Sequence, residues 1–113
     1  HAGDPLDVVV LSTYAFVPGV LVNCRPVAVM HMVDGGEADE KIIAVPTEDP
    51  RFDTVKDLAD VNAHTLKEIE HFFLTYKKLQ NKEVSISGTE GRVAAEAAFE
   101  EGMKLYSEKF PKA

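Results

Sequence analysis

Several residue types that define common classes of protein are scarce or missing in this 113-residue chain. It has no tryptophan and a single cysteine, Cys24, so the chain cannot form an internal disulfide. One cysteine in a strand-like segment fits a reducing compartment, and we interpret Cys24 as a small buried apolar residue. No apolar run approaches the ~20 residues of a membrane helix, and no signal-peptide pattern is present. These absences predict a cytoplasmic protein without a membrane partner.

Basic residues are also fewer than acidic residues in this sequence. The sequence contains 12 lysine and arginine residues against 19 aspartate and glutamate residues, which gives a net charge of −7. Surfaces that bind nucleic acids are basic, because they must neutralise phosphate charge. We therefore expect no nucleic-acid partner. An acidic balance is instead compatible with a site that holds cations.

The length and the start of the sequence define the expected domain. A chain of 113 residues with 45% hydrophobic residues is typical of a single globular domain, here residues 1–113. The first residue is His1, and the sequence opens almost inside its first motif. We therefore expect the chain to be the C-terminal part of a longer domain.

Two acidic segments stand beside apolar runs with strand character. Residues 3–7, with the sequence GDPLD, precede a run of valines, and residues 32–41, MVDGGEADEK, precede a second apolar run. Loops at strand ends let several carboxylates converge, and converging carboxylates repel one another unless a cation neutralises them. Hard carboxylate oxygens suit Mg²⁺, which often shares its ligand sphere with a substrate phosphate. Lys41 is then interpreted as a cation placed for that phosphate.

Ordinary turn chemistry is the alternative explanation for both segments. Asp-Pro and Asp-Gly are common turn dipeptides, and acidic turns flank many strands without forming a site. The spacing of the residues alone leaves both interpretations open.

Apolar alternation predicts the strands. They are expected at residues 6–11, 20–33, 41–45 and 82–87. We expect the first three to form a meander, with residues 34–41 as an acidic loop. Pro26 cannot donate a hydrogen bond to a strand ladder, so a bulge or bend is predicted at that position.

Apolar residues at helical spacing predict two helices. The first is expected at residues 63–79 with Asn62 as its N-cap, and the second from Thr89 to about Phe110. The apolar stripe of the first helix consists of Leu66, Ile69, Phe72, Phe73, Tyr76 and Leu79. From the pattern alone, Tyr76 is a core aromatic residue with its hydroxyl at the edge of the core.

Three motifs resemble one protein family. GDPLDVVV resembles the signature of the soluble (family I) inorganic pyrophosphatases, which is Asp-x-Asp-Pro-hydrophobic-Asp followed by a hydrophobic residue. PGVLVNCRPVAVMHMVDGGEADEKIIAVP is similar to the family's next long strand, acidic loop and return strand. EIEHFFLTYKKL is similar to the family helix that ends in Tyr-Lys. The resemblance covers nearly all of residues 3–110, with the motifs in the family's order.

The resemblance implies a fold, a reaction and partners. The implied fold is of the α+β class: a five-stranded, OB-like barrel with two flanking helices, whose upstream strands are missing from this chain. The implied reaction is Mg²⁺-dependent hydrolysis of inorganic pyrophosphate to two phosphates. Bacterial members of the family form hexamers, so a homo-oligomer is expected.

The resemblance also implies roles for individual residues. The general base toward a metal-bound water is Asp4, and the other implied roles are metal ligation by Asp7, Asp34 and Asp39 and phosphate binding by Lys41, Tyr76 and Lys77. The sequence departs from the family at Ala2, which stands where the first signature aspartate ligates metal, so one metal position should be weaker. The alternative is a truncated or degenerate relative that binds metal and phosphate without turnover.

Overall fold

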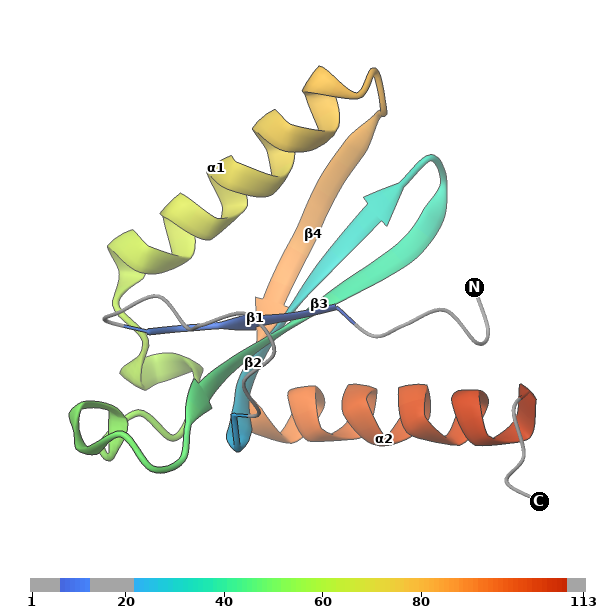
Figure 1. Cartoon of the computed structure of the whole chain (residues 1–113). Helices are drawn as coiled ribbons and strands as arrows, with labels where there is room; N and C mark the ends of the chain where they lie inside the picture. The colour runs from blue at the N-terminus through green and yellow to red at the C-terminus, as the bar shows by residue number, and fades with distance from the viewer. Residues whose placement is uncertain (1–6, 13–21, 110–113) are drawn as a thin grey trace.

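The computed structural model describes residues 7–12 and 22–109, the last five of them by their backbone alone (Figure 1). The strands are β1 (Asp7–Val10), β2 (Cys24–Asp34), β3 (Glu37–Pro46) and β4 (Val84–Glu90), and the helices are α1 (Ala63–Leu79) and α2 (Arg92–Lys109). Two short 3₁₀ helices, Pro50–Phe52 and Leu58–Asp60, connect β3 to α1. The expected α+β class is confirmed. Neither described helix has the length and hydrophobicity needed to cross a membrane.

The four described strands form one sheet in the order β1-β3-β2-β4, and the prediction of a meander is wrong. Strand β1 pairs with β3 in parallel, whereas β2 pairs with β3 and β4 in antiparallel fashion. The long connection between β1 and β2 does not force them to be neighbours, but the tight turn after β2 places β3 beside it. Within the described residues the sheet is open, as a partial OB-like barrel would be.

The turn between β2 and β3 is shorter than the sequence suggested. Gly35 and Gly36 have φ values of 61° and 84°, which lie in the left-handed region that a two-residue hairpin turn requires. Strand β3 therefore begins at Glu37. Most of the predicted acidic loop is strand, so Asp39 and Lys41 occupy regular positions in the ladder with β2.

Helices α1 and α2 cover opposite faces of the sheet (Figure 1). On the α1 face, the fully buried residues Met30, Met32 and Ile43 pack with apolar residues of α1. On the other face, Val29 and Ile42 pack against alanines of α2. Burial of each large side chain contributes roughly 1.5–3 kcal/mol. The alternation of side chains along β2 and β3 thus builds two separate cores.

The predicted irregularity at Pro26 is confirmed. The register between β2 and β3 shifts between Pro26 and Ala28, as expected where proline cannot donate to the ladder. The bulge lets the neighbours Val27 and Ala28 both join the core on the α1 face. Arg25, the residue before Pro26, donates hydrogen bonds to the backbone carbonyls of Phe52 and Val55.

One predicted helix start is confirmed and the other is displaced. Asn62 Oδ1 accepts a 2.8 Å hydrogen bond from the His64 N–H, which confirms Asn62 as the N-cap of α1. Thr89 is paired with Met30 inside β4, so it cannot cap α2, which begins at Arg92.

Candidate functional site

The described acidic candidates and Lys41 share the sheet face that α1 covers. Asp7 of β1 lies opposite Lys41 of β3. Asp39 precedes Lys41 by two residues on β3 and lies opposite Met32. Asp34 follows Met32 by two residues on β2. Residues that are paired, or two apart in one strand, point to the same face, so the strand register alone brings these side chains together.

Lys41 is a buried cation held between two carboxylates. The residue is 3% exposed, its Nζ is 3.1 Å from Asp39 Oδ2, and Nζ also donates to Asp7 Oδ2. Burial opposes the charged form of Lys41, but the hydrogen bonds to Asp7 and Asp39 outweigh it and raise the pKa above its ordinary value. A buried ammonium group is costly without such partners. The ammonium group of Lys41 is therefore stabilised in its protonated, positively charged form.

A second ion pair joins α1 to the end of β2. Lys77 Nζ lies 2.8 Å from Asp34 Oδ2, and both side chains are mostly shielded from solvent. The hydrogen bond from Lys77 lowers the pKa of Asp34 below its ordinary value, although partial burial opposes the shift. This direction is the opposite of the one that a neighbouring carboxylate would cause. The reason is that a lysine, rather than another carboxylate, is its nearest charged neighbour.

The side chains around Lys41 include two carboxylates, which are the type of ligand that a hard divalent cation takes. Asp7 and Asp39 already converge on one positive centre, the Lys41 ammonium group, and Mg²⁺ is usually bound through one or two carboxylates. Asp34 pairs with Lys77 instead, and across residues 7–12 and 22–109 no three His, Cys, Asp or Glu side chains are grouped to hold a metal. Asp4, the expected base, lies outside the described residues.

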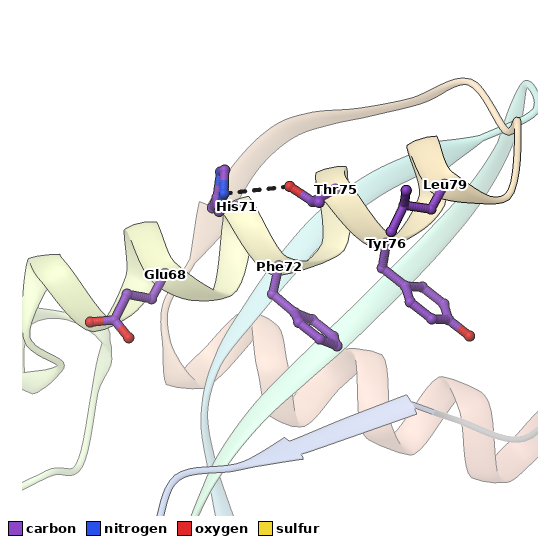
Figure 2. A pocket seen from close by; sticks show the side chains of 6 residues that line it. All are labelled: Glu68, His71, Phe72, Thr75, Tyr76 and Leu79. Atoms are coloured by element: carbon purple, nitrogen blue, oxygen red, sulfur yellow. Dashed lines mark hydrogen bonds between the residues drawn. The ribbon is translucent and has the colours of Figure 1, made fainter.

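Tyr76 lies on a partly exposed side of α1. Its ring is stacked on Phe72, with 5.9 Å between centroids and 12° between planes. Figure 2 shows both rings projecting from the same side of the helix, where they line a shallow pocket. Tyr76 is 48% exposed and Phe72 is 59% exposed. The core position that the apolar pattern alone gives Tyr76 is therefore wrong, because the core-facing stripe of α1 is narrower than the apolar stripe in the sequence. The implied phosphate-binding role of Tyr76 stays a prediction.

Phe73 is a contact that sequence reasoning missed. Its ring centroid is 5.3 Å from Lys41 Nζ, and its ring meets Phe72 edge-on with centroids 5.3 Å apart. The pattern identified Phe73 only as a core residue of α1. Its spacing of four residues from Lys77 was the available signal, because residues four apart share a helix face.

Comparison with known proteins identifies the family. A family model described as inorganic pyrophosphatase matches residues 1–107. The chain is 51% identical to the inorganic pyrophosphatase of Haloferax volcanii over 108 residues, covering 95% of this chain and 61% of the relative. It is 46% identical to the inorganic pyrophosphatase of Geobacillus stearothermophilus over 106 residues, covering 94% of this chain and 64% of the relative.

A solved structure shares the fold. The inorganic pyrophosphatase of Helicobacter pylori superposes with a TM-score of 0.86 at 44% identity, covering 94% of this chain and 64% of that chain. The present chain thus spans a little over three fifths of the length of the relatives it matches. From the matched residues and the shared fold, we conclude that the chain belongs to the inorganic pyrophosphatase family.

Proposed function

We propose that this chain carries a large part of the active site of an Mg²⁺-dependent enzyme that hydrolyses inorganic pyrophosphate to two phosphates. The similarity to proteins named inorganic pyrophosphatase supports the reaction. The observation that carries the proposal is the buried Lys41, held between the carboxylates of Asp7 and Asp39. A site of this kind combines metal-binding oxygens with a cation suited to phosphate.

The carboxylates form the acidic side of the proposed site. Asp7, Asp34 and Asp39 would hold Mg²⁺, which when bound lowers the pKa of a water molecule and neutralises phosphate oxygens. Asp4 would accept the proton of the attacking water. A carboxylate within hydrogen-bond reach of that water suits the role of general base.

Two lysines and one tyrosine form the part of the proposed site that would bind phosphate. Lys41 and Lys77 would contact phosphate oxygens as point charges, and Tyr76 would donate a hydrogen bond from its hydroxyl. Phosphoryl transfer depends chiefly on positioning and on charge stabilisation. Burial makes the charge of Lys41 more effective, because water screens it little.

The proposal extends to partners and location. We infer that the protein acts on pyrophosphate in the cytoplasm, without a nucleic-acid or membrane partner, and that it forms a homo-oligomer. Exposed apolar side chains on α1, such as Phe72 and Leu79, support association with other copies or with further protein.

A phosphate-release assay tests the proposal. The assay uses a completed protein, defined as this chain joined to the segment of the Haloferax volcanii relative that the chain does not cover. With pyrophosphate and Mg²⁺, we expect Lys41→Met to lower kcat/KM by at least ~100-fold, as for loss of one strong stabilising donor.

The matched control is Lys67→Met, because Lys67 is an exposed lysine on α1. We expect this variant to keep the parental rate. Equal rates for Lys41→Met and its parent would show that Lys41 does not serve the reaction.

A further inference from the structure

The proposed reaction does not by itself explain the contact between Phe73 and Lys41. Lys41 Nζ lies 5.3 Å from the ring centroid of Phe73, within the ≈ 6 Å range of a cation–π interaction. The lysine comes from β3 and the ring from α1, so the contact joins the sheet to the helix that covers it. Desolvation strengthens such contacts, and Lys41 is 3% exposed.

The other partners of Lys41 are needed elsewhere in the proposed site. Asp7 and Asp39 contact its ammonium group, and both would also bind Mg²⁺. Carboxylate oxygens that turn toward a metal ion are less available to the ammonium group. The face of Phe73 does not compete in this way, because Mg²⁺ takes oxygen ligands.

We propose that Phe73 is a positioning residue that holds the ammonium group of Lys41 in place for phosphate when metal occupies Asp7 and Asp39. The proposal rests on the proposed function, since the phosphate and the metal belong to it. Phe73 does not touch substrate; it acts through Lys41.

The packing of α1 makes Phe73 suitable for this role. Phe73 packs against the core that includes Met30 and Met32, and Phe72 meets its ring edge-on at 74°. These contacts hold the ring between the core and Phe72. Lys77, four residues further along α1, reaches Asp34. Helix α1 thus supplies Lys77, which is one cation of the proposed site, and Phe73, whose ring contacts the other cation, Lys41.

The test compares substitutions at Phe73 in the 113-residue chain. Isothermal titration calorimetry measures the Kd of imidodiphosphate, a non-hydrolysable analogue, in the presence of Mg²⁺. We expect Phe73→Leu to weaken binding by roughly 3- to 30-fold, the range for loss of a cation–π contact. Phe73→Tyr keeps a ring and should bind within about twofold of the parent. Phe99→Leu makes the same change on α2 and should leave the Kd unchanged.

A double-mutant cycle separates positioning from general damage. In a Lys41→Met background, Phe73→Leu should have almost no further effect on the Kd, because the cation it positions is gone. An equal effect of Phe73→Leu in both backgrounds, or none in either, would overturn the proposal.

A second readout is independent of phosphate binding. The same cycle, measured by denaturant unfolding, should show a coupling between Phe73→Leu and Lys41→Met of about threefold or more in the unfolding constant. Absence of this coupling would show that Phe73 and Lys41 do not interact energetically, and it would overturn the proposal. If the coupling is present but the parent chain does not bind imidodiphosphate, the proposed function fails in this chain. If the parent binds and the coupling is absent, the role of Phe73 alone fails.

Discussion

At the scale of single residues, Lys41 links the acidic and the cationic sides of the proposed site. Its ammonium group contacts Asp7, Asp39 and the ring of Phe73. The same carboxylates are the proposed metal ligands. In the proposed site, metal binding and phosphate binding would therefore be coupled through one side chain, because Mg²⁺ would take the same carboxylate oxygens that contact the lysine.

Substitutions in the completed protein can distinguish the proposed general base, Asp4, from a proposed metal ligand, Asp39. We expect Asp4→Asn to abolish hydrolysis but to preserve the rise in melting temperature caused by millimolar Mg²⁺, because an amide cannot accept the water's proton. Asp39→Asn should instead reduce that rise, because stabilisation by a ligand follows from its affinity for the folded state.

Two measurements decide this prediction: phosphate release, and thermal unfolding with and without Mg²⁺. Hydrolysis by Asp4→Asn near the parental rate would show that Asp4 is not the base. A parental melting temperature that does not respond to Mg²⁺ would contradict the carboxylate site as a whole.

At the scale of elements, the start of α2 depends on a distant aspartate. Asp57 Oδ1 accepts hydrogen bonds from the N–H groups of Arg92, at 2.8 Å, and Leu58, at 2.7 Å. The Arg92 bond, followed by that from Leu58, lowers the pKa of Asp57, although partial burial opposes the shift. Gly91 permits the approach, because a Cβ atom at that position would collide with Asp57 Oδ1. Asp57 therefore ties the loop after β3 to the first turn of α2.

The charge of Asp57 should make stability depend on pH. Because the folded pKa is depressed, its contribution is present above the unfolded pKa of about 3.9 and is lost as pH falls through the folded pKa. We expect Asp57→Asn to melt at a lower temperature than the parent at pH 7, and the difference to shrink below about pH 4.

Thermal unfolding at a series of pH values measures the effect. Asp53→Asn is the matched control, since Asp53 is an exposed aspartate in the same loop, and its melting temperature should follow the parent throughout. A difference between Asp57→Asn and the parent that stays constant with pH would rule out the charge as its cause.

At the scale of the whole molecule, the described sheet is left open. Strands β1 and β4 each have a single neighbour among the described strands, and Val8 of β1 is 42% exposed. Unpaired strand edges favour association with other strands. The chain also spans only 61% of the length of its Haloferax relative.

We predict that the 113-residue chain alone hydrolyses pyrophosphate at least ~100-fold more slowly than the completed protein, because we expect the added segment to supply further charged groups that stabilise the transferring phosphoryl group. We also expect its oligomer size to differ from that of the completed protein, because open edges pair with one another. Phosphate release and light scattering on both proteins provide the comparison. A chain with equal activity and equal oligomer size would show that these residues suffice.

The sequence by itself determined the class of fold, the helix α1 with its cap at Asn62, the bulge at Pro26 and the family. These features depend on local properties, such as periodicity, capping residues and the spacing of motifs. It also identified Asp7, Asp39 and Lys41 as candidates, because each lies within a recognisable motif. Such information extends over a few residues at a time, and it does not specify which strands become neighbours.

Only the tertiary structure decided that β3 lies between β1 and β2. That order brings Asp7 to Lys41, 34 residues apart in the chain, and α1 then places Phe73 beside the same ammonium group. Asp57 meets Arg92 across 35 residues in a similar way. Contacts of this length depend on the packing of whole elements against a shared core, so no local pattern in the sequence could have predicted them.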